Sequence, residues 1–233
     1  MEIMFARHFR GPSTSANGGY ACGRLAAFVE ADEVEVTLRL PPPLDQPLSV
    51  EREGDGVRLL DGDVLVAEAR PAPVELDVPA AVSLEVAEES RERHVRGWIS
   101  DFGECFVCGT REDGLDLRVG PVAGREPLHA SPIALPEALP ELVWAAIDCP
   151  GAYAVGAEGR GDIVLGRMTA RVNRVPDADE PCVVTSWPLG EDGRKLFAGT
   201  ALFSEDGEIL AVARQTWIAP RPLVAASRAI GAG

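Results

Sequence analysis

Asp148 is the residue whose surroundings point most directly to chemistry. It is the only carboxylate between Trp144 and Val155, in an otherwise apolar stretch, and Cys149-Pro150 follows it. A carboxylate in an apolar pocket has a raised pKa, which suits a general base. An Asp that precedes Pro near a helix start is also a common N-cap. The sequence therefore leaves two roles open for Asp148, general base or helix cap, and the two can coexist.

A pair of glycines, Gly18-Gly19, follows Asn17 at the expected start of a helix over residues 19–31. Backbone N–H groups at a helix N-terminus can stabilise the oxyanion that forms when a carbonyl is attacked, and glycines permit close approach. The alternative is that the missing side chains serve tight helix packing or a turn. We predict that Asn17, Gly18 and Gly19 contact the substrate.

Gln215 is a second polar candidate, in an expected strand. It lies two residues from Ala213 and from Trp217, so it faces the core if they do. A buried amide needs hydrogen-bond partners. These are either a water and a substrate carbonyl, or backbone groups, and the sequence leaves both open.

The cysteines give only half of a metal motif. Cys105 and Cys108 have the spacing of one arm of a tetrahedral zinc site, but no second pair follows, and Cys149 and Cys182 are isolated in the sequence. We therefore expect no metal and no cofactor, and interpret the pair as a turn with two small buried thiols. The odd total of five cysteines favours reduced thiols in a cytosol over a disulfide framework.

The elements that must position these residues are repeated along the chain. Residues 18–23 fall on residues 151–156, an offset of 133 positions. Three further pairs of similar segments keep the same order: 34–40 with 168–175, 47–50 with 181–184, and 60–65 with 205–210. Four matched segments in the same order arise by chance less often than any single match. We therefore predict an internal duplication.

Each half is rich in strand signals. Apolar and polar residues alternate over residues 34–40, as in a half-buried strand, and the Asp-Gly pairs at 61–62 and 206–207 predict hairpin turns. A second helix is expected from Glu137 to about Gly156, where apolar residues recur at spacings of three and four. Each half is thus predicted to be one long helix followed by an antiparallel meander that wraps around it.

The predicted domain organisation has four parts: a first unit over 1–80, a linker over 81–104, a second unit over 105–220, and a tail over 221–233. The linker contains the charged run 88–93 and is most simply solvated, although Val82, Leu84 and Val86 alternate as in a strand.

Composition limits the partners. There are 37 acidic and 22 basic residues, a formal net charge of -15, which repels a phosphate backbone or an anionic bilayer. We therefore expect no nucleic-acid partner and no membrane. The N-terminus does not resemble a signal peptide, and no apolar run is long enough to span a membrane. A soluble, cytoplasmic protein is expected, and homo-oligomer formation is left open.

A helix wrapped by an antiparallel sheet, present twice, resembles the plan of double-hotdog proteins, and short motifs agree. Residues 9–19 look like the loop that opens the hotdog helix in acyl-CoA thioesterases. Residues 144–148 are similar to the helix segment that ends in a catalytic aspartate in bacterial medium-chain acyl-CoA thioesterases of the double-hotdog type. Residues 210–215 look like their final strand, which carries a catalytic glutamine. The resemblance extends over nearly the whole chain, and uncharacterised actinobacterial thioesterase-like proteins share the pattern.

The resemblance implies an α+β fold of two tandem hotdog units with a site at their seam. It also implies that Asp148 activates a water and that Gln215 helps to hold it. The third water-binding residue of that family is a threonine on the strand after the helix. The alignment places it near Leu165 or Gly166, where no threonine stands, so Thr169 becomes the candidate for substrate contact.

The implied function is hydrolysis of an acyl-CoA or related acyl thioester, with the coenzyme A ester as the small-molecule partner. A non-catalytic acyl or acyl-CoA binding protein is the first alternative. A hotdog dehydratase or hydratase is the second, although those enzymes need a histidine and a carboxylate at the helix, and neither His8 nor His129 lies there.

Overall fold

The computed structural model describes residues 1–95, 102–157 and 163–220. Its strands form one antiparallel sheet of 11 strands in the order β1-β3-β4-β5-β2-β8-β11-β10-β9-β7-β6. The strands are β1 (Glu2–Ile3), β2 (Glu33–Leu38), β3 (Leu48–Glu53), β4 (Gly56–Asp61), β5 (Val64–Pro71), β6 (Gly120–Pro121), β7 (His129–Ile133), β8 (Val164–Val172), β9 (Cys182–Asp192), β10 (Lys195–Ser204) and β11 (Ile209–Ile218). The α-helices are α1 (Gly18–Ala26), α2 (Leu84–Glu92), α3 (Pro140–Ala146) and α4 (Cys149–Ala154), and a short 3-10 helix covers Arg7–Phe9.

Apart from the two-residue strand β6 at one edge, the two parts of the chain have the same strand order toward the middle of the sheet. It runs β1-β3-β4-β5-β2 in the first part of the chain and β7-β9-β10-β11-β8 in the second. The segments that resemble each other in sequence occupy equivalent places, and β2 and β8 meet at the centre with Val36 opposite Met168. The Asp-Gly pairs stand in the expected hairpins, where Gly62 and Gly207 have φ of 58° and 83°.

The alternation in β2 separates a core face from a charged face. Val34 and Val36 are buried in the core. Glu33 lies on the other face, where its carboxylate pairs with Arg171 of β8 at 2.6 Å. On the same face, Arg167 donates to the hydroxyl of Thr37 at 3.0 Å. The two parts of the chain are therefore joined at the β2–β8 seam by backbone pairing, by core packing and by polar contacts on the outer face.

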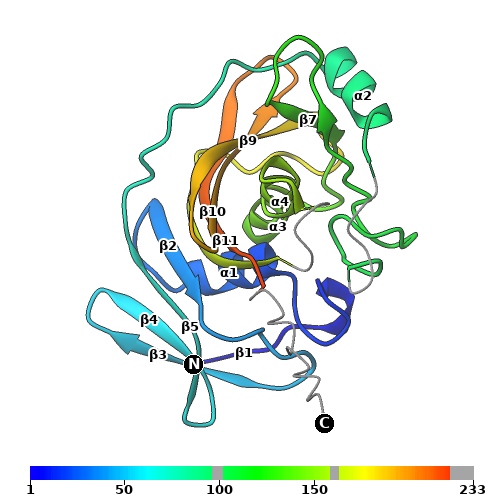
Figure 1. Ribbon diagram of the computed structural model, residues 1–233. Coiled ribbons are helices and arrows are strands. Elements are labelled where there is room, and N and C mark those ends of the chain that lie inside the picture. The colour runs from blue at the N-terminus through cyan, green and yellow to red at the C-terminus, as the bar shows by residue number, and fades with distance from the viewer. Residues whose placement is uncertain (96–101, 158–162, 221–233) are drawn as a thin grey trace, which may run out of the picture.

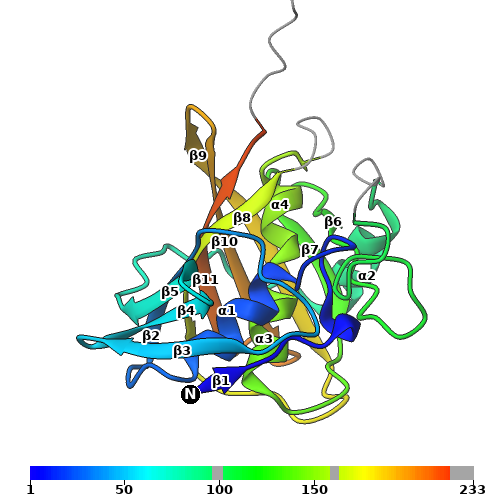
Figure 2. The ribbon, with the colours of Figure 1, turned by 90° about the horizontal axis from the view of Figure 1, so that it is seen from below.

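Helices α1, α3 and α4 lie on one face of the sheet, and the sheet curves around them (Figures 1 and 2). Helix α1 starts at Gly18, one residue before the expected start, and ends at Ala26. Its C-terminus tightens because Phe28 N–H bonds to the Leu25 carbonyl and Val29 N–H bonds to the Ala26 carbonyl. The helix is therefore shorter than the 19–31 that the sequence predicts.

The second expected helix, over residues 137–156, is in fact two helices. The break falls at Ile147 and Asp148, between α3 and α4. Pro150 explains it, because its nitrogen carries no hydrogen and its ring clashes with the carbonyl four residues earlier, that of Ala146. The apolar spacing indicates helix on both sides of the break, but the proline determines where the axis turns.

The expected linker contains helix α2 and is not simply solvated. Ser83 caps the helix by accepting from Val86 N–H at 3.3 Å. Residues 88–92 of the charged run lie within the helix, and Arg93 is its C-cap. Ala87 of the helix is fully buried, and the helix packs beside β7 (Figure 1). The strand alternative is also wrong, because residues 84–92 are helical. Residues 96–101 of the expected linker, and the expected tail at 221–233, lie outside the described part of the chain. The boundaries of the two units stay predictions.

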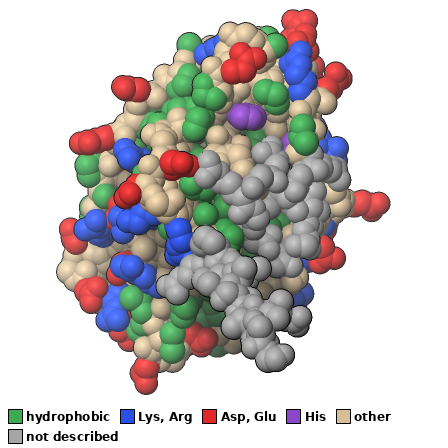
Figure 3. Space-filling model, in the orientation of Figure 1, with side chains coloured by type: hydrophobic (Ala, Val, Ile, Leu, Met, Phe, Trp, Pro, Cys, Tyr) green, Lys and Arg blue, Asp and Glu red, His purple; other side chains and the backbone are tan. Residues whose placement is uncertain are grey.

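Ionisable side chains of both signs are interspersed on the surface (Figure 3). Over β2–β5, Arg39 pairs with Glu68, and Arg70 pairs with Glu35 at 2.8 Å. The two charges of each pair neutralise each other locally, although the chain is acidic as a whole. Among the helices of the described residues, none is both long and apolar enough to cross a membrane.

Candidate functional site

The carboxylate of Asp148 lies at the N-terminus of α1, far away in the sequence. Asp148 is the N-cap residue of α4 but makes no side-chain bond to that helix. Its Oδ2 instead accepts from Gly19 N–H at 2.8 Å and from Asn17 Nδ2 at 3.1 Å. Asp148 is 2% exposed, and its Oδ1 has no hydrogen-bond partner among the residues that the structure describes. Asp148 therefore stabilises the start of α1 through Oδ2 and does not cap α4. Its Oδ1 is available for another partner.

The surroundings of Asp148 bring its titration to neutral pH. Burial raises the pKa of this carboxyl to about 7, although the Gly19 N–H and the Asn17 amide favour the charged form. The positive end of α1 acts in the same direction as those two donors. Near neutral pH the carboxyl is therefore present in both its protonated and its charged form.

Asn17 is held in one orientation by several contacts. Its Oδ1 accepts from Tyr20 N–H at 2.9 Å and caps α1. Its Nδ2 therefore points to Asp148 and also approaches the Sγ atoms of Cys105 at 3.9 Å and Cys149 at 3.7 Å. Asn17 thus joins the helix start, the carboxylate and the thiols.

The two glycines of the pair have different roles. Gly19 gives its N–H to Asp148, and a Cβ on Gly19 would lie 2.5 Å from the Trp144 carbonyl oxygen and still closer to Asp148 Cβ. Its lack of a side chain therefore serves close packing of α1 on α3, which is the alternative that the sequence left open. Within the described ranges, no group accepts from Gly18 N–H. Gly18 thus remains the candidate donor to a substrate carbonyl.

Gln215 supports the helix break from β11. Its Nε2 donates to the carbonyls of Ile147 at 2.5 Å and Asp148 at 3.1 Å, and its Oε1 accepts from Trp217 Nε1 at 2.8 Å. Two of these three partners are backbone carbonyls. This agrees with the alternative in which backbone groups, and not a water and a substrate, satisfy the amide. Thr200 of β10 also donates to the Ile147 carbonyl, at 2.8 Å. Sequence reasoning missed Thr200, because nothing in the strand pattern indicates that it faces a broken helix.

Replacing Gln215 tests this supporting role. We expect Gln215→Leu to lower the free energy of unfolding by about 3 kcal/mol, because it removes the amide's bonds to the Ile147 and Asp148 carbonyls and its bond from Trp217 Nε1. Thr200→Val removes one bond to a carbonyl that Gln215 still serves, and should cost about 1 kcal/mol. Urea unfolding of both variants measures the difference. A Thr200→Val protein less stable than Gln215→Leu would contradict this assignment.

Thr169 is not brought to the site. Its neighbours Met168 and Ala170 are buried in the core. Alternation along β8 therefore turns Thr169 to the other face of the sheet, where its hydroxyl donates to Glu35 Oε2 at 3.5 Å. The structure thus separates Thr169 from Asp148, in contrast to the predicted shared contact with substrate. Leu165 and Gly166, where the resemblance placed a threonine, do line the cavity described next.

A cavity of about 290 Å³ adjoins Asp148. Both parts of the chain form its walls, and most of the lining is apolar. Arg39 is the basic residue in the lining, and no histidine is found among the lining residues that the structure describes. The lining comprises Gly11, Pro12, Ser15, Ala16, Asn17, Gly18 and residues 38–42 from the first part, and Phe102, Cys105, Asp148, Cys149, residues 164–166, Trp217 and Ile218 from the second.

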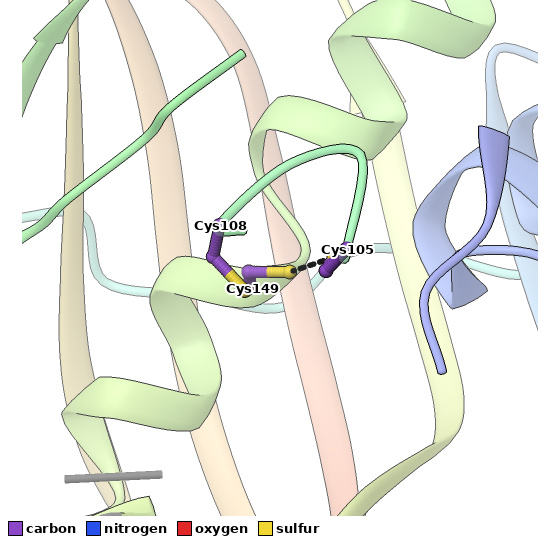
Figure 4. Close-up of side chains that lie close together, drawn as sticks. All are labelled: Cys105, Cys108 and Cys149. Carbon is purple, nitrogen blue, oxygen red and sulfur yellow. Dashed lines mark hydrogen bonds between the residues drawn. The ribbon is translucent and has the colours of Figure 1, made fainter. Parts of the chain in front are cut away.

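Three thiols converge beside this cavity. The Sγ atoms of Cys105, Cys108 and Cys149 all lie within 4.8 Å of one another, and Cys105 and Cys149 are 3.8 Å apart (Figure 4). The interpretation of Cys149 as isolated is therefore wrong, because the fold places the first turn of α4 against the loop of the Cys105–Cys108 pair. Side-chain bonds from Cys108 and Cys149 lower the pKa of the Cys105 thiol well below its usual value.

Solved structures provide the comparison. No protein-family model matches the chain, and no curated protein matches it significantly. A conserved protein of unknown function with a hot dog fold from Alicyclobacillus acidocaldarius is 12% identical, with 95% of this chain and 93% of that chain covered and a TM-score of 0.64. The acyl-CoA thioesterase II TesB2 from Mycobacterium marinum is 11% identical, with coverages of 90% and 91% and a TM-score of 0.58.

A third structure extends the range of chemistry. The dehydratase domain of PpsC from Mycobacterium tuberculosis, in complex with C12:1-CoA, is 17% identical, with coverages of 94% and 92% and a TM-score of 0.58. At these identities the likeness concerns the fold, and it extends over nearly the full length of each chain. The single antiparallel sheet curved around helices agrees with it. This chain therefore has the hotdog fold.

Proposed function

We propose that the protein hydrolyses an acyl-CoA or a related acyl thioester in the cavity beside Asp148. One observation carries the proposal: a buried carboxylate, one of whose oxygens has no partner among the described residues, lines an apolar cavity next to Gly18, whose N–H likewise makes no hydrogen bond to them. An apolar wall suits an acyl chain, and the two polar groups suit attack on its carbonyl. The thioesterases among the structures with a similar fold support the same chemistry.

In the proposed reaction, Asp148 accepts a proton from a water as the water oxygen attacks the thioester carbonyl carbon. The carbonyl oxygen becomes an oxyanion that Gly18 N–H stabilises at the positive end of α1. The C–S bond then breaks, and the leaving thiolate takes up the proton from Asp148. Asn17 and Gly19 hold the carboxylate in place, and Gln215 maintains the helix break that carries it.

The architecture proposed for this site is a tandem of two hotdog units, over residues 1–80 and 105–220. The internal repeat and the shared strand order support it. In such a tandem, the start of α1 comes from one unit and Asp148 comes from the other. The site then requires both units, which agrees with a cavity lined by both parts of the chain.

A dehydratase function is the weaker candidate. Similar structures include dehydratase domains, but that reaction needs a histidine with the carboxylate. In the described part of the chain, His8 pairs with Asp113 on the surface, and His94 contacts Val119 and Tyr153 away from the cavity lining. The residues beside Asp148 therefore favour hydrolysis over dehydration.

A substrate panel tests the proposal. The purified protein is incubated with acyl-CoA esters from short to long chain, and release of the free thiol is followed. We expect one range of chain lengths to be hydrolysed at least about 100-fold faster than without protein. Saturable binding of the esters without turnover would replace the enzyme by the acyl-CoA binding alternative, and neither binding nor turnover would remove the proposal.

Thr169 provides a control variant on the opposite face. Because its hydroxyl contacts Glu35 and does not face the cavity, Thr169→Val should leave kcat and KM within about twofold of the wild type. Steady-state kinetics with the best ester of the panel measure this. A large loss of turnover would show that the outer face of β8 takes part in the reaction.

A further inference from the structure

The three thiols beside the cavity have the arrangement of a metal site. In a tetrahedral zinc site with Zn–S bonds of about 2.3 Å, neighbouring sulfurs lie about 3.8 Å apart. The Cys105 and Cys149 sulfurs are 3.8 Å apart, and all three sulfurs lie within 4.8 Å. In Figure 4, two of the side chains come from one loop and the third from the start of α4. The thiols are thus already gathered at close to the required spacing.

A hydrogen-bond donor beside these sulfurs is a second, independent observation. The Asn17 amide approaches the sulfurs of Cys105 and Cys149 at 3.9 and 3.7 Å. Donors of this kind stabilise thiolates and orient metal ligands. The Asn17 amide therefore favours a charged sulfur at this place, and a bound cation would neutralise that charge.

The loop itself is shaped around the pair. Gly109 follows Cys108, and a Cβ there would lie 2.7 Å from the backbone nitrogen of Cys105 and also from the carbonyl oxygen of Gly103. Between residue 102 and β6, the described loop has no helix or strand, yet Cys105, Phe106 and Val107 are buried in the main core. Backbone hydrogen bonds from Phe106 N–H to the Arg10 carbonyl and from Leu117 N–H to the Val107 carbonyl hold this segment, and a metal bridge to α4 would fix it further.

We propose that Cys105, Cys108 and Cys149 bind one Zn²⁺ ion, with the fourth tetrahedral position open toward the cavity. Within the described residues, the cluster of candidate ligand atoms contains these three thiols and no fourth His, Cys, Asp or Glu. Cys105 and Cys149 also line the cavity, so solvent or a ligand in the cavity fills the remaining position. Three protein ligands with an open position are the pattern of zinc sites that bind exogenous ligands. The proposal does not depend on thioester hydrolysis.

Metal content and cobalt spectroscopy of the full chain test the proposal. Reduced protein from zinc-supplemented cells, desalted to remove loose metal, should carry one zinc ion per chain. Metal-free reduced protein titrated with Co²⁺ should develop an intense near-ultraviolet sulfur-to-cobalt band that saturates at one equivalent. Zinc should remove this band. This titration needs no substitution, so it remains decisive if a cysteine variant fails to fold.

Cysteine variants identify the ligands. Cys108→Ala and Cys149→Ala should each weaken zinc binding more than about tenfold in competition with a chromophoric chelator. The matched control is Cys182→Ala, a buried free cysteine outside the cluster, which should bind zinc as the wild type does. Absence of both zinc and the cobalt band in fully reduced protein would overturn the proposal. So would freshly isolated protein in which mass spectrometry finds a Cys105–Cys149 disulfide, or equal loss of zinc in Cys182→Ala.

Discussion

Asp148→Asn should lower kcat for the best acyl-CoA substrate by about 10²–10⁴-fold, the contribution of a positioned general base. Asparagine has nearly the same size and its oxygen can still accept from Gly19 N–H, but it cannot take a proton from water. Because the substitution preserves the cavity wall, binding of the ester should change much less than turnover. Steady-state kinetics and equilibrium binding to the same ester separate the two quantities.

The matched control for Asp148→Asn is Asp113→Asn. Asp113 is an exposed carboxylate paired with Arg111 and His8, and it does not line the cavity. Its replacement should leave kcat unchanged. If Asp148→Asn hydrolyses the ester as fast as the wild type, Asp148 is not the base, whatever its place in the cavity.

Gly19→Ala should lower the free energy of unfolding by about 3 kcal/mol and lower turnover as well. A Cβ on Gly19 would lie 2.5 Å from the Trp144 carbonyl oxygen and closer still to Asp148, both of which are held by backbone. Relief of the clash requires α1 and α3 to separate, which costs packing energy. The same movement pulls the Asp148 carboxylate away from Gly19 N–H. Urea unfolding and the thioester assay measure the two effects.

Gly18→Ala is the control for that clash. The added methyl group at Gly18 meets the end of the Leu165 side chain at 3.0 Å, and a side chain can move where backbone cannot. Its cost in unfolding free energy should be below about 1 kcal/mol. Equal destabilisation by the two substitutions would contradict the assignment of Gly19 to the close approach of α1 and α3.

The strands with a local sequence signal were predictable, whereas β1, β6 and β7 were not predicted and β2 ends at Leu38, two residues before the expected end. The alternation in β2 and the Asp-Gly turns depend on neighbouring residues, and the repeat placed equivalent strands correctly. The helix ends were less predictable. The break at Asp148 follows from Pro150, but apolar spacing continues across it. Residues 88–92 of the charged run belong to a packed helix in which Ala87 and Ser90 are the buried residues, a packing that charge alone does not predict.

The site was predictable in its members but not in its contacts. Asn17, Gly19 and Asp148 were candidates by type and position, yet no local pattern shows that Asp148 bonds to the start of another helix. Cys149 joins the Cys105–Cys108 loop only because the chain returns there, a contact that spacing cannot reveal. The orientation of Thr169, in contrast, follows from a local pattern. Because its neighbours Met168 and Ala170 are buried in the core, Thr169 faces away from the cavity.

A crystal structure with a non-hydrolysable acyl-CoA analogue, in which an amide replaces the thioester, tests the central claim most directly. We expect its acyl chain in the cavity lined by Leu38, Leu165 and Trp217, with the amide oxygen within hydrogen-bond distance of Gly18 N–H and the carbonyl carbon beside Asp148. An analogue bound elsewhere, or one whose carbonyl lies remote from Asp148, would contradict the account.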